Sequence, residues 1–135
     1  MRSPNRNEHG AAALTFVILM IPLLLICAGL VIDGGYALSA KRRALGYAES
    51  TARIAADSLN EGTVRTGDIS LAPAVAHERA TAALAAANVD GVVQIEGDEA
   101  IVEVTISQPT AMLAMVGITH ITVSSTASAR SIASN

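Results

Sequence analysis

The chain has 135 residues and a formal net charge of −3, and 51% of its residues are hydrophobic while only 2% are aromatic. The negative net charge provides no general electrostatic basis for binding nucleic acid. The single cysteine, Cys27, excludes a disulfide framework and a cysteine-based metal cluster. The length allows one small domain, which must be packed from Ala, Val, Ile and Leu because large aromatic side chains are almost absent.

Residues 1–10 form a short polar tail, and residues 11–32 contain no charged side chain. A helix over this apolar segment covers roughly 33 Å, close to the thickness of the hydrocarbon core of a bilayer. The apolar region of a cleaved secretory signal is usually shorter, about 7–15 residues. We therefore predict a transmembrane helix over residues 11–32. Arg2 and Arg6 favour a cytoplasmic tail and an extracytoplasmic C-terminal part.

Three residues of this helix and its exit have predicted structural roles. Pro22 lacks a backbone N–H and is expected to kink the helix, which membrane helices tolerate. Gly29 provides a small surface against which a neighbouring helix can pack. Asp33 is the first charged residue after the apolar segment and marks the membrane exit.

A basic cluster follows the predicted membrane exit. It comprises Lys41, Arg42 and Arg43 and begins nine residues beyond Ile32. The cluster can contact anionic lipid head groups, or it can form a solvated collar around the helix. Because it adds positive charge after the membrane segment, it also opposes the orientation that the N-terminal arginines favour.

The helical pattern continues over residues 33–60, which are rich in Ala, Leu, Arg and Glu. Apolar residues recur there near helical spacing. They are Leu38, Leu45, Ala48, Ala52, Ala55, Ala56 and Leu59. Because this face is mostly alanine, it buries little area by itself and requires a partner surface. We predict a helical stalk that continues the membrane helix and ends near residue 60.

Residues 61–135 are predicted to form a small extracytoplasmic domain. Gly62, Gly67 and Asp68 favour a loop, and Pro73 suits the first position of the Ala-rich helix that follows. The apolar surface expected on this helix to cover a sheet is Val75, Ala82, Ala83, Leu84 and Ala86.

The remainder of this region has the pattern of β-strands. Val102, Val104 and Ile106 alternate with polar residues, which predicts a strand with one buried face. The turn residues Gly97-Asp98 predict a hairpin with the preceding apolar segment, and alternation around residues 121–124 predicts a third strand. The segment PTAMLAMVG between the last two strands is expected to be a helical turn or an apolar loop. The fold class is therefore α+β, with one long N-terminal helix, one further helix and about three antiparallel strands.

No pattern of catalytic or metal-binding residues is present. His77 lacks the second helical histidine of a zinc-protease motif, and Ser124-Ser125 has no nucleophile elbow around it. We therefore predict no catalytic residue, no metal ion, no cofactor and no small-molecule substrate.

Three stretches of the chain resemble the TadE/TadG-like proteins, which are associated with tight-adherence (Flp) pilus assembly in bacteria. The first is HGAAALTFVILMIPLLLICAGLVIDGGYALSAKRR, which has a Gly before the apolar helix, a proline within it, an acid at its exit and then a basic cluster. The second is ALGYAESTARIAA, and the third is VEVTISQPTAMLAMVGITHITVSSTASAR. The resemblance implies a pilin-like, membrane-anchored and outward-facing protein without enzymatic activity.

The resemblance also implies a candidate processing site. Some members of the family resemble prepilins that are cut after a glycine, with Glu as the fifth residue beyond the cut. Gly10 and Ala11 match the two sides of such a cut, whereas the fifth residue is Thr15 and departs from the pattern.

The sequence thus predicts a structural component of a Tad/Flp-type pilus or secretion system, either a minor pilin or an assembly factor. Its expected partners are the lipid bilayer and other pilin-like or Tad membrane proteins. One alternative is a secreted binding protein, because Ala37-Leu38-Ser39 offers a small-x-small signal cleavage site. Another is a regulatory partner of a membrane complex that docks through the stalk helix.

Overall fold

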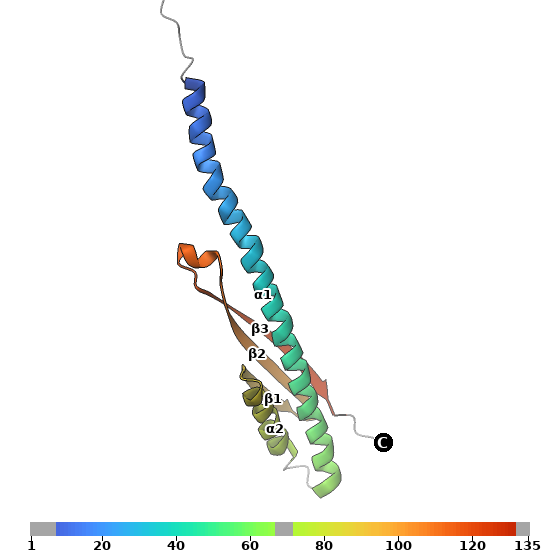
Figure 1. The fold of residues 1–135 in the computed structure, drawn as a ribbon. Helices are drawn as coiled ribbons and strands as arrows, with labels where there is room; N and C mark the ends of the chain where they lie inside the picture. The colour runs from blue at the N-terminus through green and yellow to red at the C-terminus, as the bar shows by residue number, and fades with distance from the viewer. Residues whose placement is uncertain (1–7, 67–71, 132–135) are drawn as a thin grey trace, which may run out of the picture.

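The computed structural model describes residues 8–66 and 72–131, and it confirms the predicted α+β class (Figure 1). The elements in chain order are α1 (Glu8–Thr66), α2 (Ala72–Ala86), β1 (Asp90–Glu96), β2 (Glu99–Pro109), the short 3₁₀ helix η1 (Leu113–Val116) and β3 (His120–Arg130). Some sequence predictions fall outside the described residues. They concern Arg2 and Arg6, and Gly67 and Asp68.

The 59-residue helix α1 contains both the apolar segment and the predicted stalk. It continues through Pro22 and through Gly34-Gly35 without interruption. It also extends to Thr66, beyond the end predicted near residue 60. Glu61, at the start of this extension, forms a 3.0 Å ion pair with Arg79 of α2, and both side chains are exposed. Such a surface pair contributes at most about 1 kcal/mol, so it supports helix only at the start of the extension.

The three strands form one antiparallel sheet in the order β1-β2-β3. β1 and β2 are joined by the two-residue turn Gly97-Asp98, in which Gly97 has a φ of 62°. Glycine adopts this left-handed conformation without steric cost, which explains its place in the turn. The longer connection between β2 and β3 contains η1, at the end of the sheet nearest the apolar part of α1 (Figure 1).

The register places apolar residues on one face of the sheet. Val102 pairs with Val93 on one side and Ala127 on the other, and Val104 pairs with Ser125. Val102 and Val104 are fully buried, as is Ala100. Polar residues of the intervening positions lie on the opposite face and are largely exposed. The alternation predicted for β2 and β3 is therefore correct.

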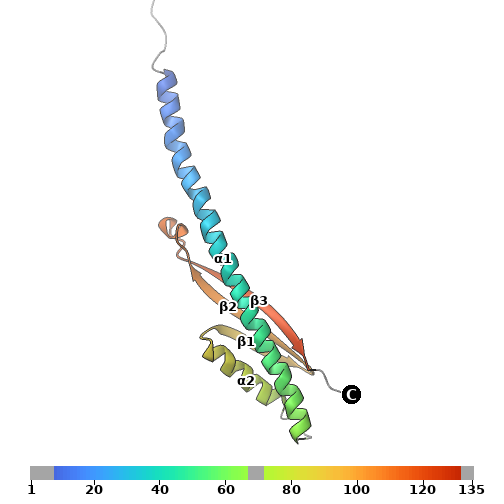
Figure 2. The ribbon, with the colours of Figure 1, turned by 45° about the vertical axis from the view of Figure 1, so that its right-hand side comes forward.

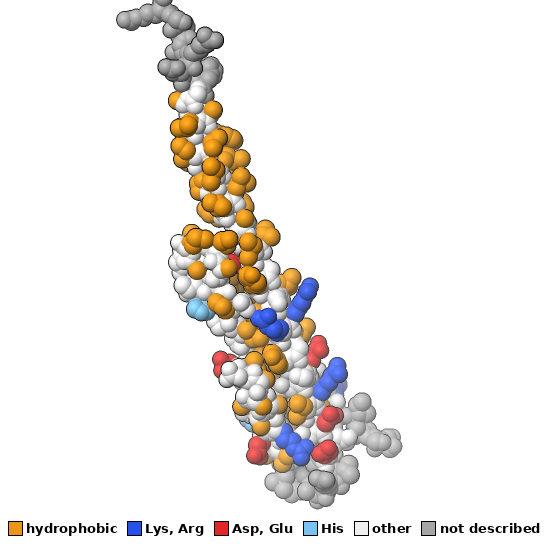
Figure 3. All heavy atoms as spheres, viewed as in Figure 1, with side chains coloured by type: hydrophobic (Ala, Val, Ile, Leu, Met, Phe, Trp, Pro, Cys, Tyr) orange, Lys and Arg blue, Asp and Glu red, His pale blue; other side chains and the backbone are white. Residues whose placement is uncertain are grey.

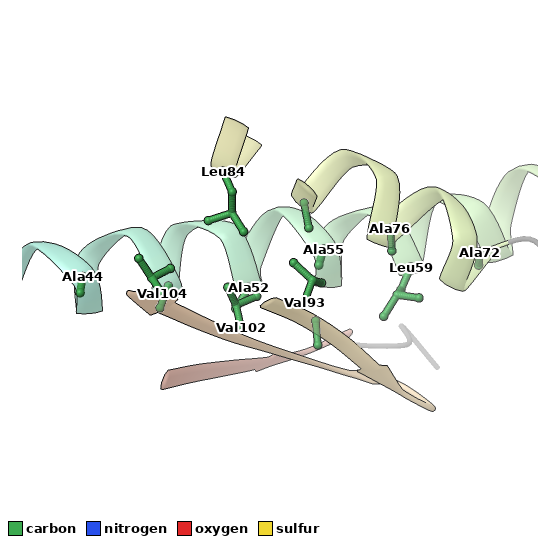
Figure 4. Packing of buried hydrophobic residues seen from close by; sticks show 13 residues of the cluster. Ala44, Ala52, Ala55, Leu59, Ala72, Ala76, Leu84, Val93, Val102 and Val104 are labelled. Carbon is green, nitrogen blue, oxygen red and sulfur yellow. The ribbon is translucent and has the colours of Figure 1, made fainter. Parts of the chain in front are cut away.

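Both helices cover the apolar face of the sheet, with α1 lying across β2 and β3 and α2 lying beside β1 (Figure 2). The buried hydrophobic residues of α1 form one stripe at helical spacing: Ala40, Ala44, Ala48, Ala52, Ala55, Ala56 and Leu59. Valine side chains of the sheet point toward this stripe (Figure 4). Alanine suits such positions because its small side chain lets a helix approach the sheet closely.

Two details of the predicted packing are wrong. The buried face of α2 is Ala72, Ala76, Ala80 and Leu84, so of the residues predicted to be apolar cover only Leu84 is buried and Ala83 partly buried. Val75 is instead 39% exposed. On α1, Leu38 and Leu45 are exposed although they were predicted to lie on the packed face. In both helices the four-residue repeat of alanine, and not the largest apolar side chains, marks the buried stripe.

One core joins the two parts of the chain that the sequence divided at residue 61. The cluster of buried residues includes Ala44 and Ala52 of α1 together with Leu84 of α2 and Val104 of β2 (Figure 4). The stalk is thus one layer of the folded domain, and the sheet has no complete core without it.

Candidate functional site at the membrane exit

The N-terminal part of α1 projects beyond the folded domain and is apolar on all sides. Apart from Met20, its large hydrophobic side chains from Leu14 to Ile32 are all exposed, as is Cys27. Figure 3 shows this apolar surface above the level at which Lys and Arg side chains begin. Among the described residues, α1 is the one helix that is long and apolar enough to cross a membrane.

Where this apolar segment ends, Asp33 connects α1 to the β2–β3 connection. Asp33 is only 1% exposed, and its carboxylate accepts hydrogen bonds from three consecutive backbone N–H groups. Oδ1 lies 2.7 Å from the nitrogen of Ala111 and 3.3 Å from that of Met112. Oδ2 lies 3.1 Å from the nitrogen of Met112 and 2.6 Å from that of Leu113. A buried charge is tolerated here because both of its oxygens are hydrogen-bonded.

The protonation of Asp33 reflects two opposing effects. Burial raises the pKa of the carboxyl group, whereas the hydrogen bonds from Leu113, Ala111 and Met112 lower it, and the pKa is lowered overall. The carboxylate therefore stays charged at neutral pH, which maintains the strong form of these hydrogen bonds.

Gly29, one turn before Asp33, is buried against the same connection. A Cβ atom at this position would lie 2.9 Å from Cβ of Met112, closer than side chains can approach. The absence of a side chain at Gly29 thus allows Met112 to contact the helix. Gly29 was predicted to contact a neighbouring helix, and the structure places it against a loop of its own chain.

The basic cluster lies just beyond this contact, and part of it binds the sheet. Arg43 Nη2 donates to Oε1 of Gln108 at 2.8 Å, and its Nη1 donates to Oγ of Ser39 at 3.4 Å. The backbone carbonyl of Lys41 accepts a 3.2 Å hydrogen bond from Oγ of Ser125. The side chains of Lys41 and Arg42 are exposed.

The remaining predicted site residues lie far from this junction, in the projecting part of α1. Gly10, Ala11 and Pro22 are exposed, and Gly10 is near the start of the helix. The hydroxyl group of Thr15 donates a 2.9 Å hydrogen bond to the carbonyl of Ala11, so it is satisfied within the helix.

No group of three or more His, Cys, Asp or Glu residues that could hold a metal ion occurs within residues 8–66 and 72–131. A shallow hollow of about 520 Å³ lies between α2 and β1, near Leu84 and Gly91. Its lining contains no nucleophile paired with a base.

Sequence reasoning identified Asp33 and Gly29 but missed their partners, Ala111, Met112 and Leu113. The available signal was the segment PTAMLAMVG, which has no charge although it connects two strands. Residues 111–113 of this segment follow Asp33 by 78 to 80 positions in the chain, and no sequence pattern predicts that they contact it.

Comparison with known proteins supports the resemblance derived from the sequence. Residues 10–58 match the Tad family model, described as "Putative Flp pilus-assembly TadE/G-like". This stretch of the chain is thus similar to TadE/G-like proteins. No curated protein and no solved structure matches the chain.

The TadE/G-like match coincides with most of α1. It contains the apolar segment, Asp33, the basic cluster and nearly all of the alanine stripe that packs on the sheet. The strands and the β2–β3 connection lie outside the matched residues. The family match and the long apolar helix together fit a membrane component associated with a Tad/Flp pilus.

Proposed function

We propose that this TadE/G-like chain is a membrane-anchored structural subunit of a Tad/Flp-type pilus or secretion system, as a minor pilin or an assembly factor. The observation that carries the proposal is the family match over residues 10–58, which covers the apolar helix and its continuation. The N-terminus is cytoplasmic and the sheet domain extracytoplasmic in this proposal, in keeping with Arg2 and Arg6.

The proposed mechanism is lateral helix packing. A helix that is apolar on all sides is stable in lipid, and it is equally stable in a bundle of similar helices, where helix contacts replace lipid contacts. Beyond the membrane segment, α1 also leaves large apolar side chains uncovered. They are Tyr36, Leu38, Leu45, Tyr47 and Ile54, each between 37% and 53% exposed. These residues flank the face that packs on the sheet and extend the surface available to a neighbouring subunit.

Site-specific photo-crosslinking in the native cell tests this proposal. A photoreactive amino acid at Leu45 is expected to form adducts with pilin-like or Tad membrane proteins, whereas the same group at Glu103, on the polar face of the sheet, is expected to form none. Equal adduct patterns at both positions, or no adduct at Leu45, would contradict helix packing.

The two roles within this proposal are separated by fractionating the cells. A minor pilin is recovered in fibres sheared from the surface, whereas an assembly factor remains with the membrane.

The orientation is tested with a Ser128→Cys variant and a thiol reagent that does not cross membranes. Labelling of intact cells is expected, and labelling only after lysis would reverse the assigned topology. The mass of the native N-terminus shows in the same samples whether the chain is cut after Gly10.

A further inference from the structure

The connection between β2 and β3, residues 110–119, has an unusual composition for a surface loop. We call these residues the tip. The tip contains no charged side chain, and Met115, Val116 and Ile118 are 77%, 64% and 49% exposed. Loops exposed to water are ordinarily rich in Gly, Pro, Asn, Asp and Ser. Single exposed apolar residues need no explanation, but a group of them on one projecting loop indicates an interaction surface.

The tip has a defined conformation, so it presents these side chains in fixed directions. The backbone N–H of Thr110 donates to the carbonyl of Thr119 at 3.0 Å, and that of Ile118 donates to the carbonyl of Leu113 at 3.0 Å. Gly117 ends η1 with a φ of 92°, a conformation that favours glycine. The three hydrogen-bonded N–H groups at Asp33 attach the other side of the tip to α1.

These contacts also fix the position of the tip along the membrane helix. Asp33 directly follows the apolar segment, whose last residue is Ile32. Met112 contacts Gly29, which lies about 4.5 Å before Ile32 along the helix axis. The tip therefore lies beside the last turn of the membrane segment. Figure 3 shows apolar side chains on the upper surface of the tip, on the side of the apolar part of the helix.

We propose that the tip inserts into the interfacial layer of the bilayer and forms a second, shallow membrane anchor beside α1. This inference rests on the proposed membrane anchoring by α1. The head-group layer is about 5–8 Å thick on each side of the hydrocarbon core, so side chains at the level of the last helical turn reach it. Apolar groups at this depth exchange water for lipid, which is favourable.

The chemistry of the surrounding residues favours lipid as the occupant. The apolar surface of the tip is continuous with the lipid-facing surface of α1, so one bilayer covers both. The carboxylate of Asp33, the one charge at this level within the described residues, is enclosed by backbone N–H groups and does not face the lipid. The two attachments, α1 and the tip, would hold the sheet domain at a fixed inclination to the membrane plane.

Depth-dependent fluorescence quenching tests the proposal with the full chain in phosphatidylcholine vesicles. Cys27 is replaced by Ser, and a single cysteine carrying an environment-sensitive fluorophore is placed at Leu19, Met115 or Thr126. Nitroxide lipids labelled at the head group or deep in the acyl chain then act as quenchers. The Met115 probe is expected to be quenched mainly by the head-group label, the Leu19 probe mainly by the deep label, and the exposed Thr126 probe by neither.

The outcomes separate the two proposals. Quenching at Leu19 without quenching at Met115 would overturn the tip anchor and leave the α1 anchor intact. No quenching at Leu19 would overturn the membrane anchor itself. Equal quenching at Met115 and Thr126 would show that the whole sheet lies on the membrane, which also contradicts insertion by the tip alone.

A matched pair of substitutions provides a second measurement, with the fluorophore at Ile118. Met115→Asp adds a charge to the tip and is expected to reduce quenching by the head-group label, because the charged tip is withdrawn from lipid. Val92→Asp adds the same charge at another exposed side chain, on the polar face of the sheet, and is expected to leave the quenching unchanged. Unchanged quenching in Met115→Asp, or an equal loss in both variants, would overturn the proposal.

Discussion

The two halves of α1 use the same secondary structure for opposite purposes. Between Leu14 and Ile32 large apolar side chains point outward in every direction and almost none is covered by the protein. Between Ala40 and Leu59 six of the nine buried residues are alanine, and the buried residues occupy one side of the helix. The first half is thus adapted to an apolar surrounding medium, and the second half to close contact with a sheet. Asp33 and Gly29 lie where the exposed apolar half ends and the half that packs on the sheet begins.

The comparison shows that helix length and helix function are set by different features. One 59-residue helix forms although Gly34-Gly35 lie between the halves, because glycine inside a helix costs only about 1 kcal/mol per residue. The environment of each half is set by side-chain size and periodicity. Large residues without periodicity require lipid or other helices, while small residues at intervals of four select one partner face.

The largest effect is expected from removing first the exposed half of α1 and then the whole helix. A fragment of residues 29–135 retains Gly29, Asp33 and the alanine stripe, and it should unfold cooperatively on heating. A fragment of residues 72–135 lacks the helix that covers β2 and β3, and it should show no cooperative transition. Circular dichroism during thermal unfolding measures both. A cooperative transition in the shorter fragment would show that the sheet domain folds without the stalk.

The next largest effect is expected from placing a charge in the shared core. Val104→Asp should cost several kcal/mol, because Val104 is fully buried and an unpaired charge there loses its hydration. A small domain has a total stability of ~5 kcal/mol, so this change should unfold residues 29–135.

Ser124→Asp is the matched control for this substitution. Ser124 is exposed on the face of the sheet opposite to Val104. It is a better control position than its partner Thr105 on β2, because the side chain of Thr105 is half-buried. A charge at Ser124 should change the free energy of unfolding by no more than about 0.5 kcal/mol. Equal stability losses in Val104→Asp and Ser124→Asp would contradict the observed register.

A smaller effect is expected from enlarging an alanine in each half of α1. Ala48→Leu should cost about 1–3 kcal/mol, because the side chain is fully buried where helix and sheet are in close contact. Ala28→Leu is the corresponding change in the exposed apolar half and should alter the unfolding of the domain by less than about 0.5 kcal/mol. Denaturant unfolding of the full chain in detergent gives both values, and similar costs at the two positions would erase the distinction between the halves.

The smallest and most local effect is expected at the junction. The pKa of Asp33 is lower in the folded chain than in the unfolded one, so the attachment of the tip is fully present above the ordinary carboxyl value of about 4. It should be lost as the pH falls through the lowered pKa, when the carboxylate is protonated and its hydrogen bonds weaken. Asp33→Asn should produce the same detachment at neutral pH.

Hydrogen exchange at the backbone amides of Ala111 and Leu113 measures this detachment directly. Exchange there should accelerate by roughly ten-fold or more in Asp33→Asn, while the amides of Val102 and Val104 in the central strand should retain their protection. Unchanged exchange at Ala111 and Leu113 would show that the carboxylate does not hold the tip. Faster exchange throughout the sheet would indicate general destabilisation instead of local release.

The sequence by itself determined the long apolar helix, the α+β class and the faces of the strands. Each of these depends on local composition or short-range periodicity: an uncharged apolar run of membrane length, or strict alternation such as Val102, Val104 and Ile106. The hairpin turn could also be predicted from local sequence, because glycine readily adopts the left-handed backbone conformation that the first turn position requires.

Only the tertiary structure decided which helix covers the sheet and what Asp33 binds. Alanine-rich helices carry a weak apolar signal, so periodicity could not distinguish the buried stripe of Ala72, Ala76, Ala80 and Leu84 from the neighbouring alanines. The contacts of Asp33 join residues far apart in the chain, and their partners are backbone N–H groups, which every residue except proline possesses. When a side chain binds backbone groups, the residue type of the partner does not reveal the contact. This junction could therefore be identified only from the tertiary structure.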